Sequence, residues 1–422
     1  MRVTLDQLAR LRGEGTPRGI TSVCSAHPVV LRAALRHGRK TGATVLIEAT
    51  CNQVNHLGGY TGMQPRDFSA LVESIAGEEG CPADQIVLGG DHLGPNPWRD
   101  RPADEAMAEA EKMMEAYVAA GFRKIHLDTS MGCAGEPPAL DDETTAKRAV
   151  RLATIAEMTA RDTGGEMPLY IIGTEVPPPG GADHVLDAIE PTAPAAARQT
   201  LAIHREMFAK AQLSDAFQRV IGIVVQPGVE FGNRNVITYQ RDKADALVRI
   251  LNDEPGLVFE AHSTDYQGEP PLTELVEDGF AILKVGPELT FVLREALYAL
   301  DLIASDLFLD YGDRPLFNAM EAVMVDRPEN WKQHYDGNDA EKRVLRHYSL
   351  SDRIRYYWTV PEARAAVKRL TAALAGKRVP LPLLWQHLPG ADQFADIPLD
   401  PQELLIWRIG KSLSTYDRAC RV

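Results

Sequence analysis

The fold is decided by the stretch Gln85-Ile86-Val87-Leu88-Gly89-Gly90-Asp91-His92-Leu93-Gly94-Pro95. Its apolar part, residues 85–88, is typical of a short parallel strand that is buried on both faces. The pair Asp91-His92 follows, so both residues are expected at the carboxyl edge of the sheet, where α/β barrels carry out their chemistry. Asp91 can move a proton and His92 can bind a metal. The alternative is a loop Asp that only caps a helix.

Seven other apolar runs share this pattern and alternate with helical stretches. The eight expected strands are residues 20–24, 44–48, 85–88, 124–128, 168–173, 220–225, 257–260 and 281–285. The alternation predicts an α/β fold with a parallel sheet, and eight units predict a closed (β/α)8 TIM barrel. An open doubly wound sheet also fits the alternation. However, the chain does not open on the Gly-x-Gly-x-x-Gly motif of dinucleotide-binding sheets.

The pattern changes after about residue 290, where a long apolar helix is expected over residues 290–306. Further helical segments and aromatic clusters follow, and no Gly- or Ser-rich linker separates them from the first part of the chain. We therefore predict a TIM barrel over residues 1–290 and a helical extension packed on it over residues 291–422.

Composition excludes some classes of function. The 422 residues carry 59 Asp and Glu against 45 Lys and Arg, for a net charge of −14, which argues against nucleic-acid binding. A small phosphorylated substrate is still compatible, because a few local cations suffice. No apolar run is long enough to span a bilayer, and the first residues lack the apolar core of a signal peptide. We expect a cytoplasmic protein without membrane contact, whose five cysteines, lacking a Cys-x-x-Cys pair, are reduced thiols.

Polar residues follow almost every expected strand, and burying so many at one rim is costly unless they bind something. His92 and His262, with several carboxylates, are what a divalent-metal site needs. Glu48 lies in an otherwise apolar strand and requires a partner. Glu260 and His262 are two apart, so both can point inward, whereas His126 is expected to be a hydrogen-bonded structural residue. His27 either begins a helix or contacts the substrate.

The last two expected strands offer a phosphate site, because barrels of this class often hold a phosphate there. Ser263, Thr264 and Lys284, with the backbone of Gly286, supply hydroxyls, N–H groups and one ammonium. Arg353 and Arg355 are further candidates that would reach over the same rim, unless they form a surface ion-pair patch.

Several segments resemble known families. Residues 121–130 resemble the fourth-strand segment of class II ketose-bisphosphate aldolases, and Asp91-His92 resembles their third-strand pair. The resemblance implies that Asp91 transfers a proton and that His92 and His262 bind a metal, with Glu175 at the position of a fifth-strand Glu. Gln226 stands where those aldolases carry another metal-binding His, which leaves Glu175 or Gln226 to complete the ligand set.

A closer resemblance covers nearly the whole chain. Residues 22–28, 47–62, 89–96, 351–358 and 416–420 are similar to the Z-subunit family of tagatose-bisphosphate aldolases, called GatZ/KbaZ. Some members of that family are D-tagatose 6-phosphate 4-epimerases, and others are non-catalytic partners of a separate aldolase chain. A kinase label also occurs, but the chain has no Gly-x-x-x-x-Gly-Lys-Ser/Thr loop.

The resemblance implies an enzyme of carbohydrate metabolism that epimerises a 6-phosphoketose at C4 by metal-assisted retro-aldol chemistry. Asp91 is the expected proton shuttle, with Glu48 or Glu175 as the second acid or base and zinc or a similar divalent metal as cofactor. His27, Asn52 and Asp128 complete the expected substrate contacts. The polar rim favours an enzyme over the alternative, an accessory subunit of a class II aldolase chain. We also expect a homo-oligomer.

Overall fold

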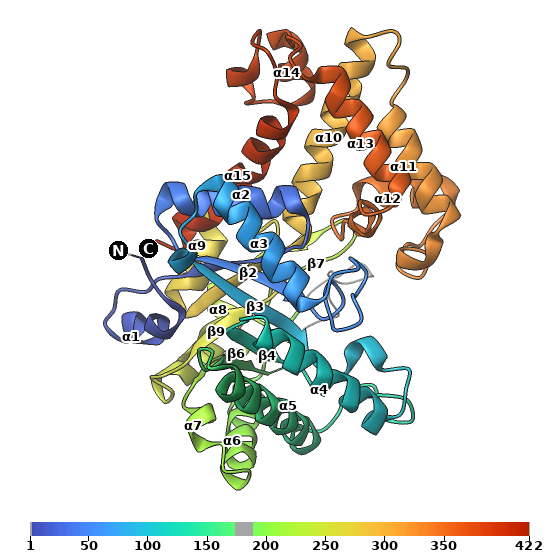
Figure 1. Ribbon diagram of the computed structural model, residues 1–422. Helices are drawn as coiled ribbons and strands as arrows, with labels where there is room; N and C mark the ends of the chain where they lie inside the picture. Colours follow the sequence, from blue (N-terminus) through green and yellow to red (C-terminus); the bar gives the residue numbers. More distant parts are fainter. Residues whose placement is uncertain (1, 174–188, 422) are drawn as a thin grey trace.

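The computed structural model describes residues 2–173 and 189–421, and its centre is a closed barrel of parallel strands (Figure 1). The barrel strands are β1 (Ile20–Cys24), β2 (Val45–Thr50), β3 (Ile86–Leu93), β4 (Lys124–Leu127), β5 (Leu169–Ile172), β6 (Val220–Val224), β9 (Val258–Ala261) and β10 (Phe280–Val285). Their order around the barrel is β1-β10-β9-β6-β5-β4-β3-β2, so each strand lies beside its neighbours in the chain. This confirms the predicted TIM barrel.

Helices between the strands cover the outside of the barrel. They are α2 (Pro28–Thr41), α3 (Pro65–Glu79), α4 (Ala103–Ala119), α5 (Asp142–Thr163), α6 (Pro194–Lys210), α7 (Ser214–Phe217), α8 (Arg241–Val248) and α9 (Glu269–Glu277). α2 begins with Pro28 and is followed by Gly42, which has a φ of 69°. A proline at the first position and a left-handed glycine past the end are the standard signals that start and stop a helix. A short hairpin, β7 (Glu230–Phe231) with β8 (Val236–Ile237), follows β6.

The last third of the chain forms the predicted helical extension. It contains α10 (Pro287–Leu307), α11 (Pro315–Asp326), α12 (Asp339–Tyr348), α13 (Pro361–Leu374), α14 (Leu381–His387) and α15 (Pro401–Ala419). Five of these helices form the lobe at the top and right of Figure 1, whereas α15 returns to the barrel and packs against α2 and α9. α15 thus closes the ring of outer helices. The exact division at residue 290 stays a prediction.

The barrel interior is apolar at its amino end and polar at its carboxyl end. Leu46, Ile171, Val258 and Ile282 form an apolar cluster. Leu5 and Leu8, which begins α1 (Leu8–Gly13), belong to the same cluster. On three of these strands the next inward position, two residues further along, is charged: it is Glu48, Glu260 or Lys284. The site therefore occupies the carboxyl half of the barrel.

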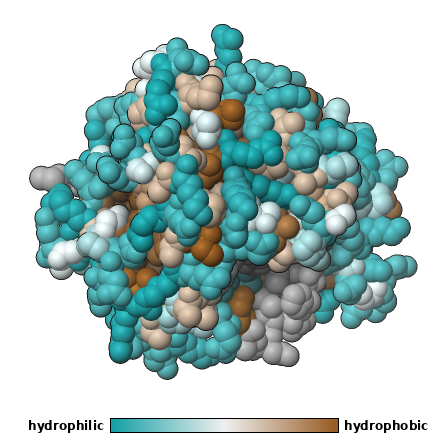
Figure 2. All heavy atoms as spheres, turned by 90° about the horizontal axis from the view of Figure 1, so that it is seen from below, coloured by the Kyte–Doolittle hydropathy of each residue, from teal (hydrophilic) through white to brown (hydrophobic). Residues whose placement is uncertain are grey.

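Among the described residues, no helix has the length and apolarity needed to cross a membrane. The face in Figure 2 is mainly hydrophilic, with its described apolar residues in small groups.

Candidate active site

A layer of buried ion pairs forms the floor of the site. The Lys124 ammonium lies 2.7 Å from Glu48 Oε1 and 2.5 Å from Glu260 Oε2. The Lys284 ammonium lies 3.1 Å from Glu48 Oε2 and 3.6 Å from Glu260 Oε1. Ser22 donates a further hydrogen bond to Glu48. Five strands thus supply this layer, and Glu48 has the partners that its burial requires.

Above this layer, Asp91, His126, Glu260 and His262 place one ligand atom each within 4.8 Å of one another. His126 Nδ1 lies 3.2 Å from Asp91 Oδ1, and His262 Nε2 lies 2.9 Å from Glu260 Oε1. Imidazoles and carboxylates are the ligands that zinc and similar divalent metals take in proteins. His126 also contacts the Gly173 carbonyl, as a structural histidine would, but it belongs to the cluster as well.

His92 stands at the edge of this cluster. Its ring centroid lies 5.1 Å from that of His126 and 5.0 Å from that of His262. Nδ1 lies 2.7 Å from Asp128 Oδ2, a carboxylate contact of the kind that fixes the orientation of a metal-binding histidine. Nε2 lies 3.8 Å from Asp91 Oδ2. Whether His92 itself binds the metal stays a prediction.

The backbone at His92 explains how two neighbouring residues share one site. Successive side chains of a strand point to opposite faces. His92 has a φ of 51°, in the left-handed region that residues other than glycine rarely adopt, and the pairing of β3 with β4 shifts register between Gly90 and Leu93. The alternation is broken there, so both side chains of the Asp-His pair face the interior. Such backbone strain concentrates at functional sites.

The charges of the site fit a bound cation. The carboxylates of Asp91, Asp128, Glu48 and Glu260 outnumber the ammonium groups of Lys124 and Lys284 by two, and His92, whose pKa Asp91 and Asp128 raise despite its burial, offsets part of this excess. Burying an uncompensated negative charge is costly, and a bound cation would offset what remains of that excess. The donor set and its charge therefore fit a divalent metal, whose identity they leave open.

Protonation states agree with this interpretation. Burial lowers the pKa of His262 to about 3, which leaves its imidazole neutral and able to bind a metal. Burial alone would raise the pKa of Asp91, but the charges of His92 and Lys284 hold it well below its usual range. Burial alone would lower the pKa of Lys284, but Asp91 and other anionic neighbours hold it well above its usual range.

A cavity of about 90 Å³ opens above the cluster. Among the predicted site residues, it is lined by Asp91, His92, His262, Asn52, Ser263, Lys284 and Arg355. Asp128 lies behind His92, and His27 lines a larger neighbouring cleft, where it caps α2 through a 3.3 Å contact from the Val29 N–H to Nδ1.

Other predicted residues lie elsewhere. Thr264 donates a hydrogen bond to the Lys284 carbonyl at 2.7 Å and does not line the cavity. Gln226 accepts hydrogen bonds from the Gly228 and Val229 N–H groups, so its side-chain oxygen caps its own loop. Glu175 lies outside the described residues.

Two of the predicted phosphate-binding cations differ sharply in surroundings. Lys284 lies among carboxylates, 2.6 Å from Asp91 Oδ1. Arg355 has no carboxylate within ion-pair distance among the described residues; it bonds to the backbone carbonyls of Ser351 and Asp352 and, at 2.8 Å, to the Tyr356 hydroxyl. Its guanidinium is thus the better placed to meet an anion at the cavity.

Arg353 does not reach the cavity. Its Nη1 donates to the Asn330 carbonyl at 3.1 Å, away from the residues that line the site. Both arginines belong to one short 3-10 helix, Arg353–Tyr357. Their different surroundings could not be read from the sequence.

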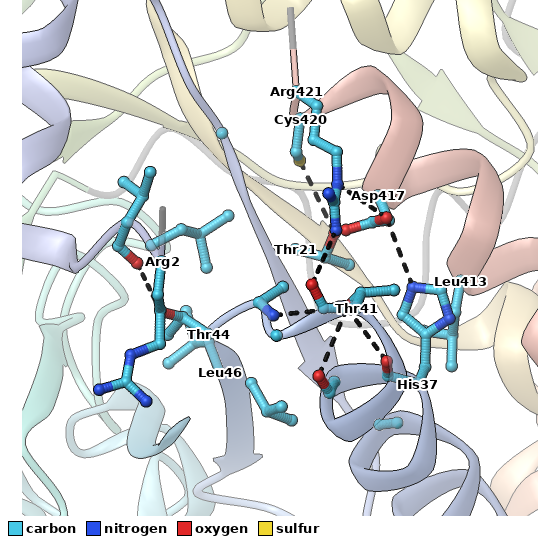
Figure 3. Close-up of a pocket in the computed structure, with 18 of the residues that line it drawn as sticks. Arg2, Thr21, His37, Thr41, Thr44, Leu46, Leu413, Asp417, Cys420 and Arg421 are labelled. Atoms are coloured by element: carbon cyan, nitrogen blue, oxygen red, sulfur yellow. Dashed lines mark hydrogen bonds and ion pairs between the residues drawn. The ribbon is translucent and has the colours of Figure 1, made fainter. Parts of the chain in front are cut away.

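A cavity at the opposite end of the barrel is chemically different. It has a volume of about 440 Å³ and lies between the ends of α2 and α15 (Figure 3). The charged side chains labelled there are paired: Arg421 lies 2.9 Å from Asp417, Arg2 lies 2.7 Å from Asp84, and His37 faces Asp417 at 3.8 Å. That end of a TIM barrel normally serves stability.

The fold and the site together define a (β/α)8-barrel protein with a histidine–carboxylate cluster at the carboxyl ends of its strands. The chain belongs to the D-tagatose-1,6-bisphosphate aldolase subunit GatZ/KbaZ-like family, whose model matches residues 5–421.

Two relatives cover nearly all of the chain. It is 60% identical over 419 residues, 99% of each chain, to a D-tagatose 6-phosphate 4-epimerase of Agrobacterium fabrum strain C58. It is also similar to a crystal structure of a probable tagatose 6 phosphate kinase from Sinorhizobium meliloti 1021. That likeness has a TM-score of 0.88 and 52% identity and covers 96% of this chain and 100% of the other.

Proposed function

We propose that this chain interconverts D-tagatose 6-phosphate and D-fructose 6-phosphate by inverting C4. The observation that carries the proposal is the complete histidine–carboxylate cluster in a chain 60% identical to a D-tagatose 6-phosphate 4-epimerase. The cluster adjoins a cavity lined by Arg355, which is half-buried and lacks a carboxylate partner among the described residues, as a phosphorylated substrate requires.

The chemistry of the two sugars favours a retro-aldol route. They differ only at C4, and the carbonyl at C2 does not acidify the C4–H bond. Cleavage of the C3–C4 bond solves this problem. The C4 hydroxyl loses its proton, C4 becomes an aldehyde carbon, and the bonding electron pair passes to C3, giving an enediolate. Rotation of the aldehyde and re-formation of C3–C4 on its other face invert C4, and the proton returns to the C4 oxygen.

The chain offers a group for each demand of this route. Asp91, at the cavity, is the base that takes the C4 hydroxyl proton and returns it. Lys284, held charged by its carboxylate neighbours, supplies a positive charge next to the developing oxyanion. Arg355 holds the 6-phosphate, and Asn52 and Ser263 orient the hydroxyls. A divalent metal held by His126, Glu260 and His262 of the cluster would polarise the C2 carbonyl and leave Asp91 free for proton transfer.

The test uses the purified chain alone. Incubation with tagatose 6-phosphate and a divalent metal is expected to give fructose 6-phosphate, and NMR spectra of the mixture measure its formation. Asp91→Asn is expected to lose turnover, while the exposed variant Asp104→Asn keeps it. Turnover only after a class II aldolase chain is added would contradict the proposal and support the accessory-subunit alternative, which the family name suggests.

The same reaction in D₂O tests the route. Because the broken bond is C3–C4, the C4 hydrogen stays on carbon, and the product is expected to carry no deuterium at C4. Deuterium at C4 would contradict the retro-aldol route without contradicting the epimerase activity.

A further inference from the structure

A second, larger cleft adjoins the candidate active site. It has a volume of about 880 Å³ and lies between the barrel and the helical extension. Its walls are the first turn of α2, the loop 59–63, α10 and α13. It shares residues with the smaller cavity, and these are Cys24, Gln53, Tyr60, Gly286 and Arg355. The cleft is therefore continuous with the site but much larger than it.

The charge of this cleft is unusual for so acidic a chain. Arg355, Arg364 and Lys368 line it, and its lining includes no Asp or Glu among the described residues, although the net charge of the chain is −14. Arg364 and Lys368 are exposed on successive turns of α13, and neither is in an ion pair within the described part of the chain. In the opposite cavity, by contrast, Arg421 pairs with Asp417 (Figure 3).

A helix amino terminus adds to this positive potential. The first turn of α2, a helix of 14 residues, faces the cleft through Pro28 and Val29. The amino end of a helix carries a partial positive charge that favours anions, and it acts here through the helix dipole, because the Val29 N–H already donates to His27. Side chains and backbone thus act in the same direction.

The remaining lining is largely apolar. Leu293 and Leu297 of α10 and Val367 of α13 contribute aliphatic surface, and Trp358 contributes an aromatic one. The Trp358 side chain is 5% exposed, and its indole N–H has no hydrogen-bond partner among the described residues. Ligand sites of a few hundred to about 1,000 Å³ combine such apolar walls with a few polar anchors.

We propose that this cleft binds a small organic anion with an apolar body, separate from the sugar phosphate. The anionic group lies against Arg364, Lys368 and Arg355, and the apolar body lies against Leu293, Leu297 and Val367. Because Arg355 faces both cavities, such a ligand competes with the 6-phosphate of the substrate. This last step rests on the proposed function, whereas the binding itself does not.

The binding test uses 8-anilinonaphthalene-1-sulfonate, an aromatic sulfonate that fluoresces in apolar surroundings. The full chain is expected to bind one dye molecule per chain. The double variant Arg364→Ala/Lys368→Ala, which removes two charge contacts, is expected to weaken binding about tenfold or more. Val367→Trp, which fills the cleft, is expected to abolish it. The charge-matched control Lys40→Ala/Lys332→Ala, at two exposed lysines outside both cavities, is expected to bind like the unaltered chain.

The outcomes separate the possibilities. Equal dye affinity in the control and in both cleft variants, or no binding to the unaltered chain, would overturn the proposal. Circular dichroism spectra show whether each variant is folded, and a folded Val367→Trp chain that binds the dye normally would also overturn it. Adenosine monophosphate and an acidic peptide are compared as competitors of the dye. If the peptide displaces the dye at a lower concentration than the nucleotide does, the ligand is a protein partner and not a small anion, which would overturn the assigned ligand class.

Steady-state kinetics test the competition. The dye is expected to raise the KM for tagatose 6-phosphate without lowering kcat, and its inhibition constant is expected to rise about tenfold in Arg364→Ala/Lys368→Ala. A fall in kcat at constant KM would overturn the proposal that the dye and the 6-phosphate of the substrate compete for Arg355. If the chain has no epimerase activity, only the proposed function is contradicted. The dye titration still decides whether the cleft is a ligand site.

Discussion

Arg355 is the residue on which substrate affinity is expected to depend most. Its guanidinium lies at the cavity with no carboxylate partner among the described residues, so a phosphate would gain charge-assisted hydrogen bonds there. Arg355→Met is expected to cost about 2–4 kcal/mol of substrate binding, or a KM about 30- to 1,000-fold higher. Arg353→Met is the matched control, because Arg353 does not line the cavity. An equal rise of KM in Lys284→Met but not in Arg355→Met would return the phosphate role to Lys284.

His262 is expected to decide metal content. Its imidazole is neutral, buried and part of the four-residue cluster. His262→Ala is expected to lower the content of bound divalent metal to about a tenth of the original or less, measured by inductively coupled plasma mass spectrometry. Even residues that only orient a metal ligand typically change metal affinity about 10- to 100-fold when they are replaced. His56→Ala, at a histidine outside the cluster, is the control. His92→Ala and His126→Ala, measured in parallel, show which of these two histidines is a ligand.

Glu230 is expected to make stability depend on pH. Burial raises the pKa of this carboxyl from 4.5 to about 7. A raised pKa means that the folded chain binds the proton more tightly than the unfolded one. This contribution is fully present below pH 4.5 and is lost as the pH rises through about 7.

Glu230→Gln is therefore expected to be more stable than the original chain at pH 8, by up to about 3 kcal/mol, and nearly equal to it at pH 4. Urea denaturation at the two pH values measures this difference, and the exposed Glu105→Gln is the control. An equal shift at both pH values would show that the carboxyl does not titrate with unfolding.

For single residues, the sequence predicts which residues lie at the site better than it predicts which side chains they contact there. It places Asp91, His92, His262 and Lys284 at strand ends, and all four line one cavity. It does not predict the Lys124 ion pairs, because these join strands far apart in the chain. The alternation Lys124, His126, Asp128 was the available signal, since three polar residues two apart in a short strand all face one side.

At the scale of elements, inward-facing residues of the strands form a layer of buried charges, and the stability of the fold depends on the balance of positive and negative charge in that layer. Lys124 is fully buried between Glu48 and Glu260. Lys124→Met leaves two buried carboxylates short of a partner and is expected to lower the free energy of unfolding by about 3–5 kcal/mol. Lys112→Met, which breaks an exposed pair with Glu109, is expected to cost about 0–1 kcal/mol. Urea denaturation measures both, and equal small effects would contradict the view that the layer needs Lys124.

Strand existence was predictable and strand ends were not. Residues 85–88 were expected as a strand, whereas β3 extends over Ile86–Leu93 and includes the Asp-His pair. The extension depends on pairing with β2, which continues to Asp91, and such pairing is a tertiary effect that a local pattern does not contain. The same holds for Thr264 and Gln226, whose bonds to backbone groups take them away from the cavity.

At the scale of the whole molecule, the last helix is part of the barrel although all eight strands precede it. Buried side chains of α15, among them Leu404, Ile409 and Leu413, face inward, and the helix packs against α2 and α9 (Figure 1). The sequence predicted helices after residue 290, but it could not show that the last one returns, because the contact joins the two ends of the chain. Gly19 N–H donates to the Cys420 carbonyl at 2.9 Å, which fixes this return.

The return of α15 leads to a stability prediction. Ile409 is fully buried, so Ile409→Ala is expected to cost about 2–5 kcal/mol, whereas the exposed Gln402→Ala is expected to stay within about 0.5 kcal/mol. A chain that ends at Leu399 exposes the apolar faces of α2 and α9 and is expected to aggregate, because a broad exposed apolar patch promotes association. Light scattering and circular dichroism of the shortened chain measure this. A monodisperse shortened chain with the original spectrum and thermal midpoint would show that α15 is dispensable and that the barrel closes without it.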